Sequence, residues 1–170
     1  TTGAILPCWT SVERSRYGPG IGAYSAGATK SGVAVDSGTA PEIWPRYAAC
    51  VADAMTPVLR QLGPDAQFME IGGGSGAFAE TCLSKLLAND ALPARYAILE
   101  PSADLRERQR ERLQERLPPL LFEMVEWLDG PIQESWNGVL FANEVIDALP
   151  TPRFTIRDGE VFEEHVALDG

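Results

Sequence analysis

Apolar positions recur with two different periods along the chain. Between Pro41 and Leu62 they follow three- and four-residue steps, which predicts a helix that Gly63-Pro64 ends. The short apolar run "AQFMEI" predicts a buried strand, and "SGAFAETCLSKLLAND" after it returns to helical spacing. A charged helix begins at Ser102 or Asp104, either of which suits a helix N-cap. Further strands are predicted at "RYAILE", "LLFEMVEWL" and "NGVLFANE".

Strands that alternate with helices in this way indicate an α/β fold with a parallel, doubly wound sheet. Asp158-Gly159 lies between two alternating runs, which predicts a β-hairpin. The first forty residues are rich in Gly, Ser, Thr, Ala and Pro, so we expect an irregular but ordered segment there. The predicted organisation is therefore 1–40 irregular segment, 41–150 α/β core and 151–170 hairpin that begins a further element.

Composition narrows the range of partners. The formal net charge is −10, which argues against a nucleic-acid surface because such a surface needs an excess of Lys and Arg. The three cysteines, Cys8, Cys50 and Cys82, form no C-x-x-C motif, so neither a disulfide framework nor a metal site is predicted. No apolar run has membrane-spanning length, and no secretory signal is recognisable. We therefore expect no membrane association and a compartment such as the cytoplasm, or the mitochondrial matrix in a eukaryote.

The run "GGGSG" separates the first predicted strand from its helix. Glycine permits a sharp turn there and lets a ligand approach the backbone without meeting a Cβ atom. Gly72, Gly74 and Gly76 are therefore candidate ligand-binding residues. A glycine-rich turn that only satisfies packing is the alternative, because a single motif of this kind is weak evidence.

Acidic residues at the strand ends sharpen this hypothesis. Glu100 ends the second predicted strand, where a carboxylate can accept both hydroxyl hydrogens of a ribose. This combination predicts a cofactor that contains adenosine, and NAD and S-adenosylmethionine (SAM) both fit the glycine pattern. Glu70 favours SAM, since a carboxylate suits a cationic sulfonium and would repel a pyrophosphate. The fourth strand ends in "NEVIDALP", which adds Asn143, Glu144 and Asp147 at the same rim, although Asn and Asp are also ordinary caps.

Four segments resemble the MidA-type family of SAM-dependent methyltransferases, which includes the mitochondrial complex I assembly methyltransferase. They occur in the family's order and are "RYGPGIGAYSAGATKSGVAVDSGTAPEI", "MEIGGGSGAFAETCL", "YAILEPSADLRERQRERL" and "VLFANEVIDALPTPRF". The resemblance extends from about Tyr17 to Phe154. Its "TAPEI" and "NEVIDALP" segments are more specific than the glycine loop, which is shared by class I methyltransferases in general.

The resemblance implies a Rossmann-like class I SAM-dependent methyltransferase fold and a role for each matching residue. The glycines and Glu70 would form the SAM loop, and Glu100 would bind the ribose. Asn143 and Glu144 would lie beside the transferable methyl group, with Asp147 there or capping the next turn. Trp127 and Leu128 fall where such folds line the adenine, although core packing is an equal alternative for both. Asp36, Thr39 and Glu42 match the segment that closes over the cofactor.

Three functions follow as hypotheses. We expect first a SAM-dependent methyltransferase that acts on a protein side chain, with arginine in a respiratory-complex subunit as the favoured acceptor. A non-enzymatic assembly factor that kept the fold is the second, and an NAD-linked oxidoreductase the third. Family members continue well beyond the hairpin. We therefore expect a truncated fold in which the sheet has an unpaired edge and an exposed apolar face.

Overall fold

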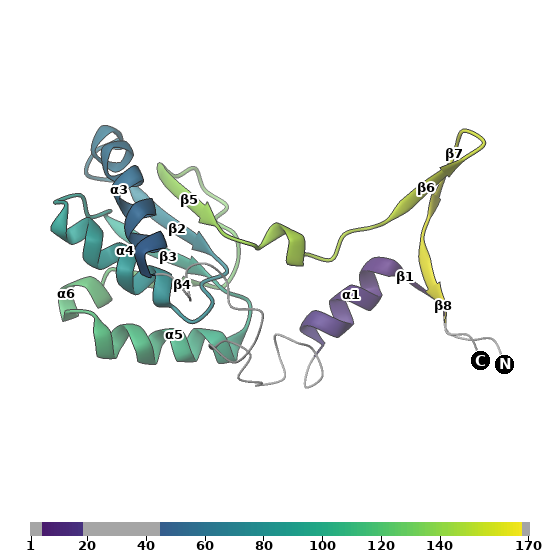
Figure 1. Cartoon of the computed structure of the whole chain (residues 1–170), viewed down its shortest axis with the longest axis horizontal. Coiled ribbons are helices and arrows are strands. Elements are labelled where there is room, and N and C mark those ends of the chain that lie inside the picture. Colours follow the sequence, from purple (N-terminus) through teal and green to yellow (C-terminus); the bar gives the residue numbers. More distant parts are fainter. Residues whose placement is uncertain (1–4, 19–44, 168–170) are drawn as a thin grey trace. The chain divides into compact units, whose positions relative to one another are not determined.

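The computed structural model describes residues 5–18 and 45–167, which belong to two compact units (Figure 1). The larger unit runs from Thr29 to Val145, and the smaller combines Thr1–Ala28 with Ile146–Gly170. The elements of the larger unit are α3 (Pro45–Leu62), β2 (Gln67–Ile71), α4 (Ala77–Ala88), β3 (Arg95–Leu99), α5 (Ala103–Arg116), α6 (Pro119–Phe122), β4 (Val125–Leu128) and β5 (Gly138–Ala142).

The four strands of the larger unit form one parallel sheet in the order β4-β3-β2-β5. Each passage from one strand to its parallel neighbour runs through a helix or a long connection, as parallel pairing requires. The predicted α/β class and parallel sheet are confirmed. Within the described residues β5 is an edge strand, and Leu140 on it is 54% exposed.

The core lies between the helices and one face of this sheet (Figure 1). Alternate residues of a strand share a face, and Phe68, Tyr96 and Ile98 are fully buried against the helices. The Phe68 and Tyr96 rings stack with centroids 5.1 Å apart, and those of Phe78 and Phe141 with centroids 4.1 Å apart. Such contacts fix the strand register, because a slip of one residue would turn these rings out of the core.

Local sequence signals explain most element boundaries. Helix α3 ends at Leu62 because Gly63 adopts a left-handed conformation with φ +94°. Pro57 lies inside α3, which continues through it as a single element. The Ser102 side chain accepts a hydrogen bond from the Leu105 N–H and caps α5, as predicted. The strand predicted over "LLFEMVEWL" is wrong in its first half, where a proline in the first turn supports the short helix α6.

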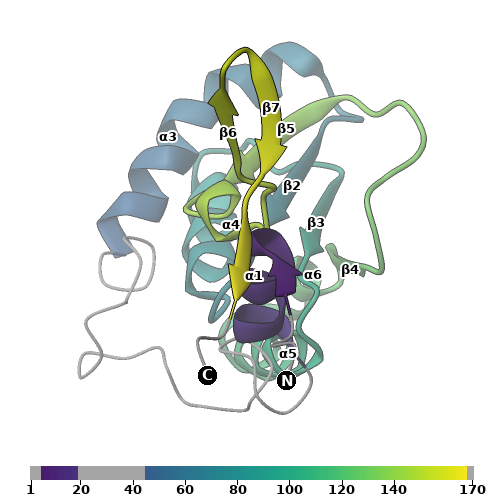
Figure 2. The same cartoon turned by 90° about the vertical axis from the view of Figure 1, so that its right-hand side faces the viewer.

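The smaller unit contains β1 (Ile5–Pro7), α1 (Cys8–Tyr17), the short 3₁₀ helix η1 (Ile146–Ala148), β6 (Phe154–Arg157), β7 (Glu160–Glu163) and β8 (His165–Ala167). Figure 2 shows β6 and β7 as the predicted antiparallel hairpin, which turns at Asp158-Gly159. Strand β8 pairs antiparallel with β1. Helix α1 occupies part of the segment for which we expected irregular structure.

None of the helices in the described part of the chain combines the length and apolarity required to cross a membrane.

Candidate functional site

Three predicted site residues follow strands that end at the same level of the sheet. Ile71, the last residue of β2, is in register with Leu99 of β3 and Ala142 of β5. Gly72, Glu100 and Asn143 are the next residues of their chains, so the fold brings them to one rim. In open α/β sheets, ligands bind outside the carboxyl ends of the strands.

The glycine loop between β2 and α4 depends on glycine for two reasons. Gly72, Gly74 and Gly76 have φ values of +72°, +51° and +80°, which side chains rarely allow. Gly73 has no space for a side chain, since a Cβ atom there would lie 2.9 Å from Cγ2 of Ile98. A Cβ on Gly72 would lie equally close to Cγ2 of Val145, so the turn after β5 packs directly on this loop.

Glu100 is 5% exposed at the end of β3. Its Oε1 accepts from the Ser102 N–H at 3.0 Å, and its Oε2 lies 3.5 Å from Nε2 of Gln109. Burial raises the pKa of this carboxyl, and the hydrogen bonds from Ser102 and Gln109 oppose that effect. A carboxylate offers about four acceptor sites, so two donors leave capacity for ribose hydroxyls.

Glu70 lies deeper than a residue that only lines the rim, because it is 2% exposed. Its Oε2 accepts a 2.7 Å hydrogen bond from the Tyr96 hydroxyl. Burial raises the pKa of Glu70 to about 8, the Tyr96 hydrogen bond opposes this shift, and the nearby charge of Glu100 adds to it. The buried Cys82 thiol also has a raised pKa, caused first by burial and then by Glu70. The proposed contact of Glu70 with a cationic ligand stays a prediction.

Asn143 and Glu144 form the turn after β5. The Tyr47 hydroxyl of α3 donates a 3.0 Å hydrogen bond to Oδ1 of Asn143, whereas the buried Nδ2 has no hydrogen-bond partner among the described residues. Glu144 is exposed and has φ +51°, a strained conformation for a residue with a Cβ and one that often marks functional sites. Asp147 lies in η1 of the smaller unit, where its backbone oxygen accepts from the Arg16 side chain.

Trp127 is packed beneath α5. Its indole Nε1 donates to Oε1 of Gln109 at 2.9 Å, and the Arg110 guanidinium lies 4.9 Å from the ring centroid. Phe122 packs beside it with centroids 6.3 Å apart. These contacts favour the packing role that the sequence left open, and the adenine role of Trp127 stays a prediction. Leu128, its neighbour on β4, points to the opposite face of the sheet.

The three residues predicted to close over the cofactor, Asp36, Thr39 and Glu42, lie outside the described residues. Gln109 is a site residue that sequence reasoning missed. It is completely buried in the middle of α5 and contacts both the glycine loop and Glu100. Its signal was positional, because it lies four residues from both Leu105 and Leu113, and residues four apart share one face of a helix.

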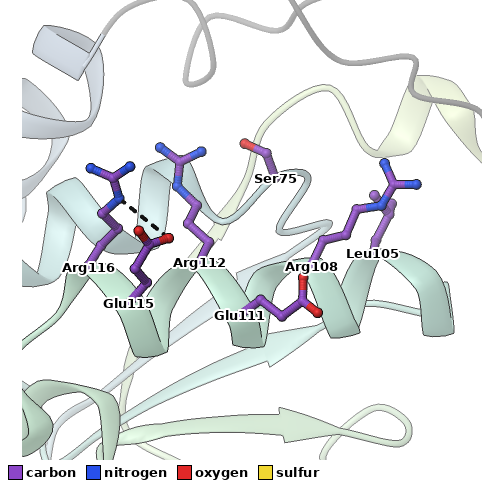
Figure 3. Close-up of a pocket in the computed structure, with 7 residues that line it drawn as sticks. All are labelled: Ser75, Leu105, Arg108, Glu111, Arg112, Glu115 and Arg116. Carbon is purple, nitrogen blue, oxygen red and sulfur yellow. Dashed lines mark ion pairs between the residues drawn. The ribbon is translucent and has the colours of Figure 1, made fainter.

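A groove beside Ser75 follows the outer face of α5 (Figure 3). Three arginines one turn apart line it, and each forms an ion pair with an acidic side chain: Arg108 with Asp104, Arg112 with Glu80 and Arg116 with Glu115. This pairing is typical of a solvent-exposed helix with alternating charges. Each of the three positive charges is balanced by a carboxylate, so the groove does not favour an anionic ligand. No group of three or more His, Cys, Asp or Glu side chains in the described ranges could hold a metal ion.

The residues at the rim fit a cofactor that contains adenosine. The loop offers backbone that a ligand can approach closely, the first turn of α4 offers N–H groups that a helix leaves unpaired, and Glu100 retains acceptor capacity. Together with the parallel sheet, these features define the class of Rossmann-like, nucleotide-cofactor-binding proteins.

The comparisons narrow this class. Residues 50–170 match the family described as "Putative S-adenosyl-L-methionine-dependent methyltransferase". The chain therefore belongs to this methyltransferase family. Comparison with the curated proteins gave no match.

Two crystal structures of COG1565 superfamily proteins from Burkholderia thailandensis are similar to the chain. One, bound to S-adenosyl-homocysteine (SAH), shares 36% identity with a TM-score of 0.84, over 98% of this chain and 43% of that one. The second shares 34% identity with a TM-score of 0.79, over 98% of this chain and 41% of that one. The chain thus spans less than half the length of these relatives, and the predicted class I methyltransferase fold is confirmed over the part that it spans.

Proposed function

We propose that this chain forms the cofactor-binding part of a SAM-dependent methyltransferase. The observation that carries the proposal is the alignment of the glycine loop, Glu100 and Asn143 at one rim of the sheet. The SAH-bound relative supports SAM over NAD as the ligand, since its fold matches this chain closely. Glu100 would hold the ribose, and the loop between β2 and α4 would contact the amino-acid end.

When bound, SAM would supply a methyl group made electrophilic by its sulfonium. The demands on the protein are to align the acceptor, to exclude water and to control the acceptor's protonation. Asn143 and Glu144 are suited to this role, because Val145 beside them packs on Gly72 of the loop. The Tyr47 hydroxyl fixes the Asn143 amide and leaves its Nδ2 to donate to a ligand.

We further propose that the acceptor is a protein arginine. A guanidinium nitrogen is a weak nucleophile while its lone pair is delocalised, and a carboxylate that binds it can orient it and localise charge on the other nitrogens. The exposed Glu144 is the first candidate. The acceptor nitrogen would form a bond to the methyl carbon as the carbon–sulfur bond breaks, and would lose a proton to Glu144 or to solvent. The resemblance to the MidA-type family favours a respiratory-complex subunit as the substrate.

Calorimetric titration with SAM, SAH and NADH tests the cofactor. Glu100→Ala should weaken SAH binding at least ~10-fold, because each lost hydrogen bond to a charged group contributes about 1.5–3 kcal/mol. Glu126→Ala is the matched control, since Glu126 is an exposed acid on β4 that pairs with Arg95. NADH binding without SAM or SAH binding would overturn the proposal.

Transfer of a labelled methyl group to peptides that differ only in Arg, Lys or Gln tests the acceptor. We expect label on the Arg peptide alone and its loss in Glu144→Gln. Label on Lys would refute the arginine assignment but leave the methyltransferase assignment standing. Partner binding that survives loss of both SAM and Glu144, with no transfer to any peptide, would favour the non-enzymatic assembly factor.

A further inference from the structure

Gln109 is completely buried in the middle of the charged helix α5. Most of its sequence neighbours are Arg or Glu, yet its side chain points into the protein. A primary amide removed from water destabilises the fold unless its hydrogen bonds are replaced. The partners of Gln109 therefore explain why an amide is tolerated there.

Each end of the Gln109 amide has a defined partner. Nε2 donates to the Gly74 carbonyl at 2.9 Å and lies 3.5 Å from Oε2 of Glu100, whereas Oε1 accepts from the Trp127 indole at 2.9 Å. Only one orientation of the amide satisfies all three contacts, because a flipped amide would turn its oxygen toward two acceptors. One side chain thus joins the glycine loop, the end of β3 and Trp127 of β4.

The glycine loop is also shaped to fit Gln109. A Cβ atom on Gly73 would lie 3.0 Å from Nε2 of Gln109, and one on Gly76 would lie 3.4 Å from its Cα. A side chain on Gly73 would therefore press against both Ile98 and the Gln109 amide, whereas a Cβ atom on Gly76 would make ordinary contact with α5, and it is the φ of +80° that favours glycine there. The Gln109 amide thus packs directly against the loop.

We propose that Gln109 is a positioning residue for the cofactor site, which holds the Gly74 peptide and the Glu100 carboxylate at the spacing that the amino-acid end and the ribose of SAM require. This inference rests on the proposed function. Gln109 acts through its neighbours, because its Nε2 and Oε1 atoms are already hydrogen-bonded to protein groups. Its amide is required for SAM affinity, and its packing volume alone is not sufficient.

Gln109→Met tests the amide, because methionine has a similar length and retains the buried volume without the hydrogen bonds. Leu113→Met is the matched control, since it introduces the same side chain one turn further along the buried face of α5. On the 170-residue chain, we expect Gln109→Met to weaken SAH binding at least ~10-fold, as for loss of a buried hydrogen-bond partner, and Leu113→Met to stay within about 2-fold. Equal affinities for the two variants would overturn the inference.

Gln109→Glu separates positioning from packing by its pH profile. An ionised carboxylate would face the Gly74 carbonyl and Glu100, whereas the protonated form can donate to one of them. The ratio of its SAH dissociation constant to that of the wild-type chain should fall toward 1 between pH 8 and roughly pH 5.5. The introduced carboxyl titrates as a coupled pair with Glu100, which lies beside it, and the wild-type reference removes the effect of Arg106. A ratio independent of pH would contradict the inference. If Gln109→Met does not fold, Gln109→Glu measured at acid pH serves as the test in its place.

The indole N–H signal of Trp127 provides a readout without ligand. Assigned by Trp127→Phe, it should shift and exchange faster with solvent in Gln109→Met but not in Leu113→Met. Absence of SAH binding to the wild-type chain would overturn the proposed function, and this inference with it. SAH binding that Gln109→Met leaves unchanged would overturn only the inference.

Discussion

Replacement of Glu70 by Gln should stabilise the fold at neutral and alkaline pH. The Glu70 carboxyl is buried, its pKa rises from 4.5 to about 8, and it accepts a hydrogen bond from the Tyr96 hydroxyl. Between these two values the unfolded chain carries an ionised Glu70 and the folded chain a protonated one. Folding therefore takes up a proton, and the free energy of unfolding falls as the pH rises through this interval.

The size of the effect follows from the shift. At about 1.4 kcal/mol for each pH unit, Glu70 should lower the free energy of unfolding by about 3 kcal/mol at pH 7 and by about 5 kcal/mol above pH 8, relative to acid pH. Gln has a similar shape, does not titrate and can still accept from Tyr96. Glu70→Gln should therefore match the wild-type chain near pH 4 and exceed its stability progressively above that.

Urea unfolding at a series of pH values between 4 and 8.5 measures this difference. Glu100 also has a raised pKa and titrates in both proteins. Its charge is one cause of the Glu70 shift, so the difference between the two profiles reports Glu70 together with its coupling to Glu100. Raised pKa values keep Cys82 and Tyr96 neutral across this range. Glu126→Gln, a change of the same type at an exposed acid, should leave the pH profile almost unchanged. Parallel profiles for Glu70→Gln and the wild-type chain would refute the reasoning.

Three other predictions give simpler tests. Gly73→Ala should lower stability by about 1–3 kcal/mol in urea unfolding, as expected for overpacking, while Gly130→Ala, which meets nothing within 4 Å, should be close to neutral. Ser102→Ala should cost about 1 kcal/mol through loss of the α5 cap, measured by thermal unfolding. Tyr47→Phe should slow methyl transfer about 2- to 10-fold by freeing the Asn143 amide, with SAH affinity retained; an unchanged rate would remove Asn143 from the proposed acceptor site.

The larger unit was largely predictable because its elements follow local rules. Short apolar runs between amphipathic helices favour buried strands, and Ser102 and Gly63 mark helix ends by their own chemistry. The strand predicted across α6 failed because "LLFEMVEWL" is apolar apart from Glu123 and Glu126, and such a run carries no clear period that separates helix from strand. Two prolines before it were the stronger signal.

The candidate site was predictable at those positions where the residue type has few structural explanations other than ligand binding. Glycines at a strand-to-helix turn and an acid at the next strand end predict a cofactor rim without knowledge of packing. Gln109 was not predictable in this way, because a glutamine in a charged helix looks like a solvent-facing residue. Its role depends on how closely α5 approaches the loop, which is a tertiary property. Likewise, the burial of Glu70 depends on the helices that cover β2, so its raised pKa was not visible in the strand alone.

The three free thiols differ in accessibility, so their rates of reaction with a thiol reagent report local opening of the native chain. Cys50 is exposed on α3, Cys8 is half-buried and Cys82 is buried on α4 next to the sheet. A thiol reacts as the thiolate, so a reagent should modify Cys50 at once and reach Cys82 only when α4 lifts from β2 and β3. The slow phase of labelling would then measure how often the layer beneath the glycine loop opens in the native protein. Bound cofactor should slow that phase in proportion to its affinity.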